Sequence, residues 1–260
     1  MKKQEIKNFH GVIMTRYEKL VRGLGSYFKK TNFSKAVVGI SGGIDSALTL
    51  RIAVDALGSE NVLAVFMPEN SATSEESKVC SQEIADFCKV NLILQSIDDF
   101  LLPLGSLSWE SKNNAKANFK ARVRMCLLYH LANSENALVL GTCNKTEIMI
   151  GYFTKFGDGA SDVEVIGDIL KTEVFSMAKE IGIPQKIINR KPTAELEIGQ
   201  EDEVDLGGSY RDIDEVLKKI MTFKKDAANI KTSLEKNIYE RFEGNLHKTN
   251  KIPVLSVDEN

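Results

Sequence analysis

The hexapeptide Ser41-Gly42-Gly43-Ile44-Asp45-Ser46 combines residue types that bind phosphate and metal. An apolar, strand-like run at 36–40 leads into it, and a helical pattern at 47–57 follows. Glycines leave backbone amides free to approach phosphate oxygens, serines add hydroxyl donors, and a helix N-terminus favours anions. Because a carboxylate repels a phosphate unless a divalent cation lies between them, Asp45 predicts a phosphate site that also holds Mg²⁺.

Other interpretations of this segment imply other chemistry. A plain glycine turn is one, and Gly39-Ile40-Ser41-Gly42-Gly43 also fits the G-x-S-x-G nucleophile elbow of α/β-hydrolases. Only 38 residues, mostly helical in pattern, precede Gly39, and only two of the three histidines follow Ser41, so a serine hydrolase is the weaker alternative. A Walker A loop is excluded because its phosphate-binding lysine has no counterpart.

Apolar runs alternate with helical patterns along the chain. The runs lie at 36–40, 62–67, 92–94 and 137–140, and the helical patterns at 4–29, 47–57, 75–88, 114–133 and 172–181. This alternation predicts an α/β fold, a doubly wound parallel sheet with flanking helices and a C-terminal helical extension, in a single domain spanning 1–260. We also expect Thr73 and Glu76 to form a capping box, and Gly182 with Pro184 to end the 172–181 helix.

Composition limits the classes of protein to consider. The net charge is −2, with 34 basic and 36 acidic residues, which does not suit a general nucleic-acid binder. The first residues are charged where a signal peptide is apolar, and no run approaches transmembrane length, so we expect a cytoplasmic enzyme without a membrane or nucleic-acid partner. Cys80, Cys88, Cys126 and Cys143 lack C-x-x-C spacing, which favours buried or partly buried thiols over zinc or a redox pair.

A second acidic residue, Glu147, follows the strand-like run 137–140. Open sheets bind ligands beyond the carboxyl ends of strands where the strand order reverses, so the loops after Ile40 and Leu140 are expected to form the site. If these strands are neighbours, Glu147 approaches the phosphates near Asp45, and two carboxylates with phosphate oxygens and water suit Mg²⁺. The alternative is that Glu147 is a first-turn acid favoured by the helix dipole.

Several motifs in order resemble those of NAD synthetases, members of the PP-loop or ATP pyrophosphatase family. The resemblance extends over about residues 35–250 and is more specific than any single motif. It rests on the hexapeptide, Gly141-Thr142-Cys143-Asn144-Lys145-Thr146-Glu147, Phe153-Thr154-Lys155-Phe156-Gly157-Asp158-Gly159, Pro192-Thr193-Ala194-Glu195-Leu196, the helical stretch 116–125 and His247-Lys248.

The resemblance implies a Rossmann-like fold of the adenine nucleotide alpha hydrolase type and an enzyme that joins ammonia to deamido-NAD. ATP would adenylate the deamido-NAD, and the products would be NAD, AMP and pyrophosphate, in the last step of NAD biosynthesis. Mg²⁺ would lie on Asp45 and Glu147. The implied ATP-binding residues are Gly39, Ile40, Ser41, Gly42, Gly43, Ile44, Asp45, Ser46, Thr142, Lys171 and Thr193, and the implied deamido-NAD-binding residues are Arg122, Lys155, Asp162, His247 and Lys248.

Some roles stay open at this point. Asp158 either stabilises a tight turn between its two glycines or accepts a proton from ammonium. Lys171 and Lys248, taken singly, would be solvated surface charges. Arg124 lies two residues from Arg122 on a helix, so we expect it to face elsewhere and form a surface salt bridge. The polar stretch 190–209 is expected to be a lid.

The nitrogen donor and the quaternary structure are further expectations. Glutamine-using relatives carry a fused amidotransferase domain with a nucleophilic cysteine, whereas all four cysteines here lie in the synthetase-like region, so free ammonia is the expected donor. The resemblance also implies a homodimer whose subunits share the active site.

Two further rival functions remain. One is a PP-loop ligase acting on another nucleotide or on tRNA, which the neutral charge and the lack of paired cysteines disfavour. The other is a nucleotide-binding protein without activity, which would not need both Asp45 and Glu147.

Overall fold

The computed structural model describes residues 14–193, 201–223, 232–255 and 257. Within these residues lies a parallel five-stranded sheet in the order β3-β2-β1-β4-β5. The strands are β1 (Lys35–Ile40), β2 (Val62–Phe66), β3 (Leu92–Leu94), β4 (Ala137–Gly141) and β5 (Val163–Glu164). The predicted doubly wound parallel fold is therefore confirmed, and the strand order reverses between β1 and β4 as expected.

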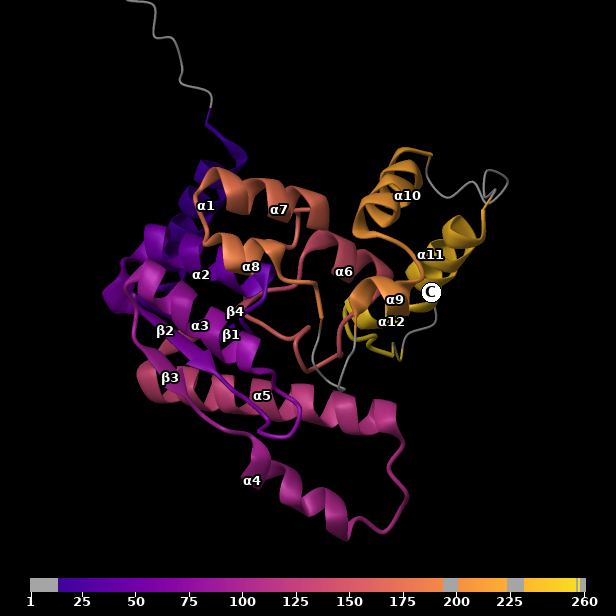
Figure 1. Ribbon diagram of the computed structural model, residues 1–260, viewed down its shortest axis with the longest axis horizontal. Helices are drawn as coiled ribbons and strands as arrows, with labels where there is room; N and C mark the ends of the chain where they lie inside the picture. Colours follow the sequence, from indigo (N-terminus) through magenta and orange to yellow (C-terminus); the bar gives the residue numbers. More distant parts are fainter. Residues whose placement is uncertain (1–13, 194–200, 224–231, 256, 258–260) are drawn as a thin grey trace, which may run out of the picture.

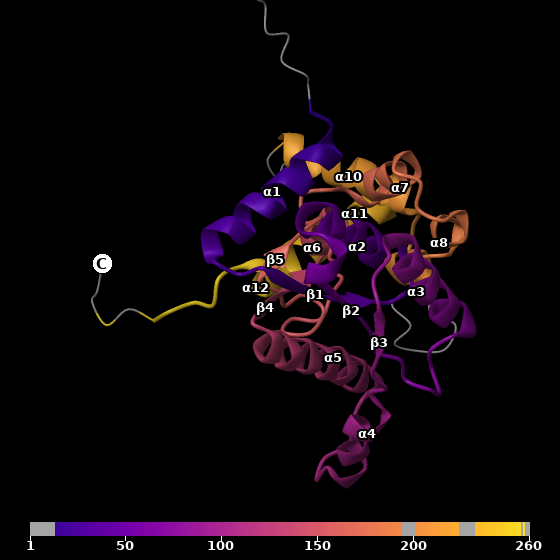
Figure 2. The same cartoon turned by 90° about the vertical axis from the view of Figure 1, so that its left-hand side faces the viewer.

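Both faces of the sheet are covered by helices (Figures 1 and 2). Along β1, Ala36 and Val38 pack on one face and Val37 on the other, because successive side chains of a strand alternate. The first face is covered by α1 (Arg16–Thr31), α2 (Ile44–Leu57), α3 (Glu75–Cys88), α7 (Lys171–Glu180) and α8 (Gln185–Asn189). The opposite face is covered mainly by α5 (Asn113–Glu135).

The C-terminal helices form the predicted extension beside the sheet, to the right in Figure 1. They are α9 (Asp202–Leu206), α10 (Tyr210–Phe223), α11 (Ser233–Gly244) and α12 (Leu246–Thr249); α10 and α11 lie against α6 (Lys145–Ile150), and α12 lies against α11. A separate apolar cluster joins α6, α9, α10 and α11, and it includes Ile150, Leu206, Ile213, Leu217 and Ile238. The extension thus has its own core, which places α10 next to α6 and α7.

The segment between β3 and α5 projects from the body beyond α5 (Figures 1 and 2). It contains α4 (Asp98–Leu101) and the 3₁₀ helix η2 (Leu102–Ser106); a second 3₁₀ helix, η1 (Ser59–Asn61), precedes β2. Large apolar side chains of β3 and of this segment are exposed, most of all Leu94 at 69%, Leu102 at 74% and Trp109 at 66%. We call residues 92–112 the apolar arm. In the described part of the chain no helix is both long and apolar enough to cross a membrane.

Local details differ from the expectations. The capping box of Thr73 and Glu76 is wrong: the N-cap of α3 is Ser74, whose side chain accepts from the Ser77 amide, while the Thr73 hydroxyl accepts from the Glu69 amide at 3.0 Å. Helix α2 begins at Ile44 rather than at residue 47, which puts Asp45 in its first turn. Residues 4–13 of the predicted N-terminal helical pattern lie outside the described residues.

Candidate functional site

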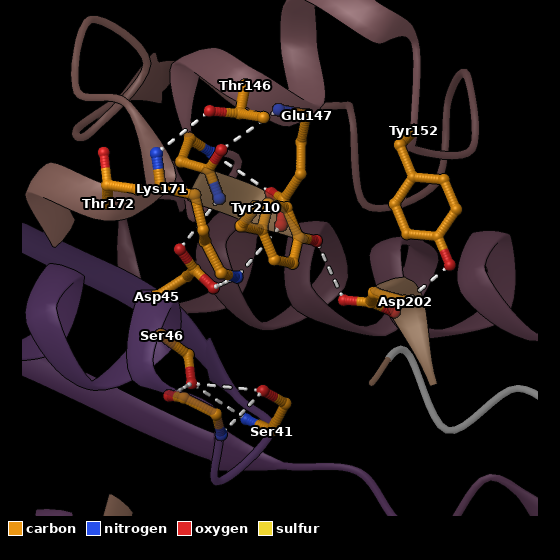
Figure 3. Close-up of polar contacts among 12 residues, drawn as sticks. Ser41, Asp45, Ser46, Thr146, Glu147, Tyr152, Lys171, Thr172, Asp202 and Tyr210 are labelled. Carbon is orange, nitrogen blue, oxygen red and sulfur yellow. Dashed lines mark hydrogen bonds and ion pairs between the residues drawn. The ribbon is translucent and has the colours of Figure 1, made fainter. Parts of the chain in front are cut away.

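The loop between β1 and α2 is held in shape by its own serines. Ser46 Oγ donates to the Gly43 carbonyl at 3.0 Å and accepts from the Ser41 amide at 3.2 Å, and Ser41 Oγ accepts from the Gly43 amide at 3.2 Å (Figure 3). Gly42 has φ +77°, and a Cβ there would lie 2.6 Å from the Ser77 carbonyl oxygen. Only glycine fits this position without strain, because the left-handed conformation and the close backbone both exclude a side chain.

A cavity of about 260 Å³ opens at the carboxyl ends of β1 and β4. Most of the predicted ATP-binding residues line it, and only Gly42 among them does not. Apolar side chains of β2, β4 and α5 complete the walls. The predicted residues on its surface are Gly39, Ile40, Ser41, Gly43, Ile44, Asp45, Ser46, Thr142, Lys171 and Thr193 for ATP, together with Glu147 and Asp158.

Asp45, Glu147 and Lys171 meet at one edge of this cavity (Figure 3). Lys171 Nζ lies 2.5 Å from Asp45 Oδ2 and 3.4 Å from Glu147 Oε1. Lys171 is only 2% exposed, so it is not a surface charge. Burial alone would lower the pKa of Lys171, but the carboxylates of Asp45 and Glu147 outweigh burial and raise it. The ammonium group is therefore firmly protonated.

Glu147 has two tasks at once. Its Oε2 accepts from the Asn144 amide at 3.2 Å, completing a capping box at the start of α6, while its Oε1 faces Lys171. Burial raises the pKa of Glu147 to about 8; Lys171 opposes this rise and Asp45 adds to it. Asn144 also donates to Asp45 Oδ1 at 2.9 Å, so it links the loops after β1 and β4.

The donor set fits a magnesium ion that is only partly held by protein. Within the described ranges no group of three or more His, Cys, Asp or Glu side chains is arranged to hold a metal. Asp45 and Glu147 offer hard carboxylate oxygens, which Mg²⁺ prefers, and Mg²⁺ commonly takes its other ligands from phosphates and water. Such a site would be completed by a bound nucleotide.

Three residues that sequence reasoning did not assign extend this polar cluster. Asp202 of α9 lines the cavity, is 5% exposed, and accepts from Tyr152 at 3.1 Å and from Tyr210 at 3.0 Å (Figure 3). The Tyr210 ring centroid lies 4.9 Å from Lys171 Nζ, within the range of a cation–π contact. The acidic run 201–205 was visible in the sequence, but nothing in its spacing indicated which carboxylate turns inward.

The five residues expected at deamido-NAD do not line this cavity. Three of them form a chain, since Arg122 Nε donates to the Lys155 carbonyl at 3.2 Å and Lys155 Nζ donates to the His247 carbonyl at 2.5 Å. Lys248 Nζ donates to the carbonyls of Gly151 at 2.7 Å and Phe153 at 2.9 Å. These hydrogen bonds join α5, the 151–157 loop and α12.

Asp162, the fifth of these residues, lies apart from the chain of Arg122, Lys155 and His247. Its carboxylate accepts from the Val139 amide at 2.8 Å, beside β4.

Asp158 is placed at the cavity by a tight turn. Its Oδ1 accepts from the Thr154 amide at 2.9 Å, and its carbonyl accepts from Cys143 Sγ at 3.4 Å. Asp158 stays accessible from the cavity, yet the protein atoms packed around its carboxylate raise its pKa by desolvation. Both roles considered for Asp158, in the turn and at the site, fit this position.

Arg124 and Arg190 line the cavity, although Arg124 was expected to face elsewhere. Arg124 was expected in a surface salt bridge, but its Nε donates to the Met67 carbonyl at 2.9 Å. The reason is that Arg124 shares the cavity-facing side of α5 with Ala121, Met125 and Leu128. Arg190, which sequence reasoning did not single out, donates to Ser77 Oγ at 2.6 Å and to the Ser41 carbonyl at 3.3 Å.

The remaining expectations concern the serine, the cysteines and the lid. Among the described residues no histidine hydrogen-bonds to Ser41, whose hydroxyl contacts Ser46 and Gly43 instead. Cys80, Cys88 and Cys143 are buried as expected, whereas Cys126 is exposed. Ala194, Glu195, Leu196 and the rest of 194–200 lie outside the described residues, so the lid stays a prediction.

The chain is similar to known proteins in both sequence and fold. The family model described as NAD synthase matches residues 16–252. An NH(3)-dependent NAD(+) synthetase from Methanococcoides burtonii is 40% identical over 245 residues, covering 91% of this chain and 92% of that protein. An NMN synthetase structure from Francisella tularensis has a TM-score of 0.81 and 29% identity, covering 93% of this chain and 97% of that one. The NH3-dependent NAD synthetase structure from Campylobacter jejuni has a TM-score of 0.78 and 28% identity, covering 92% and 97%.

Proposed function

The chain belongs to the NAD synthase family, and on that premise we propose that it joins ammonia to deamido-NAD at the expense of ATP. The products are NAD, AMP and pyrophosphate, and the reaction is the last step of NAD biosynthesis. One observation carries the proposal: the hexapeptide loop, two carboxylates and a buried lysine from separate parts of the chain meet in one cavity. A plain nucleotide-binding protein has no need of this charged group.

The first step is adenylation. A nicotinate carboxylate oxygen of deamido-NAD attacks the α-phosphorus of ATP, the bond from that phosphorus to the bridging oxygen breaks, and pyrophosphate leaves. Helix α2 begins at Ile44 in the wall of the cavity, and we propose that its first amides, which have no acceptor within the helix, receive the phosphate oxygens, with Lys171 supplying a fixed positive charge nearby. Prearranged charge of this kind stabilises the transition state without reorganisation during the reaction.

Mg²⁺ is the proposed cofactor, held by Asp45 and Glu147. When bound, it would screen the negative charge of the phosphates. The charges of the protein itself support this assignment, because Asp45 and Glu147 carry two carboxyl groups toward one ammonium group, that of Lys171. The two carboxylates outnumber the ammonium group, which favours a cation beside them, and the phosphates of ATP would offset the positive charge that Mg²⁺ adds.

The second step forms the amide. Ammonia attacks the carbonyl carbon of the mixed anhydride, the bond to the AMP oxygen breaks, and the new nitrogen loses a proton. We assign Asp158 as the proton acceptor, because its carboxylate lines the cavity and its raised pKa makes it a better base than an ordinary aspartate. Ammonia rather than glutamine is the donor in the relatives' names.

The deamido-NAD site is proposed to extend beyond the cavity. Arg122, Lys155, His247 and Lys248 gather outside it, and the arginine and the two lysines carry the positive charge that a dinucleotide pyrophosphate or a nicotinate carboxylate requires. Asp162 completes the proposed set. The ATP-binding set keeps Gly42 and Thr193, and the whole chain, 1–260, is proposed as one domain.

A homodimer with shared active sites is also proposed. The exposed Leu94, Leu102 and Trp109 of the apolar arm support it, since exposed apolar side chains grouped on one segment favour burial against a partner. Residues of the deamido-NAD set could then serve the neighbouring subunit. We place the enzyme in the cytoplasm.

One assay tests the reaction. The protein is incubated with ATP, Mg²⁺, ammonium and deamido-NAD, and NAD and pyrophosphate are followed together. Equal amounts of both products are expected. A parallel reaction with nicotinate mononucleotide tests the substrate, because one structural neighbour is named an NMN synthetase. Faster amidation of the mononucleotide would overturn the deamido-NAD assignment, and ATP cleavage without amidation of either would overturn the proposed function.

A further inference from the structure

Asp214 of α10 is a carboxylic acid with no exposed surface, far from the sequence motifs of the site. Its Oδ1 accepts from Thr146 Oγ1 at 2.5 Å, and its Oδ2 accepts from the Thr172 amide at 2.8 Å and the Thr172 hydroxyl at 2.7 Å. Burying a carboxyl group costs free energy unless its oxygens are satisfied. Here α6 and α7 satisfy both oxygens of a residue on α10.

The partners of Asp214 are the chain neighbours of the charged pair in the cavity. Thr146 immediately precedes Glu147, and Thr172 immediately follows Lys171. The Lys171 amide in turn donates to Thr146 Oγ1 at 2.9 Å, so the Thr146 hydroxyl accepts from one helix and donates to another. Figure 3 shows this hydrogen bond, with Glu147 beside Thr146 and Thr172 beside Lys171. One carboxylate thus ties together the starts of α6 and α7.

The same side of α10 reaches Lys171 a second time. Tyr210 lies four residues before Asp214, and positions i and i+4 share a helix face. Tyr210 places its ring against the ammonium of Lys171, whereas Asp214 holds the backbone around it. Residues of α10 therefore fix both the side chain of Lys171 and the backbone next to it.

Packing alone does not explain an acid at this position. Ile213, the preceding residue, and Leu217 already attach α10 to the apolar core of the extension. Apolar contacts are not directional, whereas three hydrogen bonds to one carboxylate define the offset of α6 against α7. That offset determines whether Glu147 and Lys171 face the same point.

We propose that Asp214 is a positioning residue that aligns Glu147 and Lys171 for the ATP-dependent reaction. Asp214 itself does not line the cavity, so it acts through Thr146 and Thr172. The expected fall in kcat rests on the proposed function. The expected change in the alignment of α6 and α7 rests on the hydrogen bonds alone.

The primary test is Asp214→Asn, which keeps the shape but turns one acceptor oxygen into a donor. Either Thr146 or Thr172 then loses its acceptor. We expect kcat to fall on the order of 10- to 100-fold, the range for lost outer-shell support or a misplacement near 1 Å, while KM for deamido-NAD is unchanged. We also expect the backbone amides of Lys171 and Thr172 to exchange hydrogen faster.

Ile213→Val is the matched control. Ile213 is equally buried on the same helix but makes apolar contacts in the extension core. It should lower Tm without changing kcat per folded molecule or the exchange of the Lys171 and Thr172 amides. A loss of activity that merely follows loss of stability would be equal in the two variants.

Thr146 variants keep the proposal testable if Asp214→Asn does not fold. Thr146→Ser retains the hydroxyl and should behave like the wild type, whereas Thr146→Val removes it and should resemble Asp214→Asn. The double variant should be little worse than either single one, because both remove the same interaction. Wild-type kcat in Asp214→Asn or Thr146→Val, or unchanged amide exchange, overturns the proposal. Wild-type protein that forms no NAD refutes the proposed function, and amide exchange still decides the alignment.

Discussion

Lys171 Nζ lies 2.5 Å from Asp45 Oδ2, although 126 positions separate the two residues in the chain. Asp45 belongs to the first turn of α2 after β1, and Lys171 opens α7 after β5. Strands β1, β4 and β5 are consecutive in the sheet, so their carboxyl ends meet at one edge. The contact follows from that topology, and it fixes a positive charge beside the loop between β1 and α2.

Replacement of Asp45 by Asn should reduce kcat on the order of a hundredfold or more, the typical effect of losing one charge-stabilising group. Asparagine can keep the hydrogen bond from Asn144 and Glu147 still faces Lys171, so the protein should fold, although it loses stability because Lys171 loses the nearer of its two carboxylates. NAD formation measured against Mg²⁺ concentration should show a higher Mg²⁺ requirement. Asp55→Asn, on the same helix but paired with Tyr17 and Arg51, is the control. Normal turnover by Asp45→Asn would refute the metal assignment.

Replacement of Lys171 by Met should destabilise the protein by about 3 kcal/mol, because it leaves two largely buried carboxylates without their partner. That figure is the lower end of the usual range, since Asp45 and Glu147 side chains stay 17% and 15% exposed. Urea unfolding measures the effect. Lys145→Met removes the solvent-exposed pair with Asp168 and should cost under about 1 kcal/mol. Equal losses in the two variants would contradict the prediction.

Replacement of Gly42 by Ala should destabilise the loop and weaken ATP binding. The new Cβ would combine a φ of +77° with a separation of 2.6 Å from the Ser77 carbonyl oxygen. Gly182→Ala separates these effects, because Gly182 has φ +74° but nothing within 4 Å of its Cβ position. Gly182→Ala should cost about 1 kcal/mol and leave activity intact. ATP binding, measured by calorimetry, should be weakened only in Gly42→Ala. Wild-type affinity for ATP in that variant would contradict the prediction.

Replacement of Glu164 by Gln should remove a loss of stability that occurs as the pH rises from acid to neutral. Burial raises the pKa of Glu164 from 4.5 to about 7, so the folded state binds this proton more tightly than the unfolded state. Stability is then lost as pH rises from about 4.5 to 7, by at most about 3 kcal/mol. Glu164→Gln should match the wild type at pH 4 and exceed its Tm at pH 8. The control is Glu180→Gln, at an exposed position. If the difference in Tm between Glu164→Gln and the wild type is the same at pH 4 and pH 8, the prediction is wrong.

Charged substitutions on the apolar arm should convert the proposed dimer to monomer. Leu94→Lys combined with Leu102→Glu places charges where two exposed apolar side chains now lie. Analytical ultracentrifugation should show a dimer for the wild type and a monomer for this variant. Val79→Lys, at an exposed position on α3, should remain a dimer. A wild type that is monomeric and fully active would refute the shared site.

Strands β1 to β4, and the position of the hexapeptide between a strand and a helix, were predicted well because their signals are local. Buried parallel strands read as short apolar runs, and the run at 92–94 coincides with β3. The helix at 75–88 also has its predicted bounds, yet its cap was misplaced by one residue, because several neighbouring side chains there can accept hydrogen bonds. Strand β5 was missed since two residues carry no recognisable pattern.

By itself the sequence determined the α/β architecture, and it predicted a loop for phosphate at the hexapeptide and the approach of Glu147 to Asp45. Only the tertiary structure decided that Lys171 is buried between them, that Arg124 and Arg190 line the cavity, and that Asp202 and Asp214 turn inward. The physical reason is range. Periodicity and glycine spacing express local backbone preferences, whereas these contacts join residues brought together by sheet order and by the separate core of the C-terminal helices.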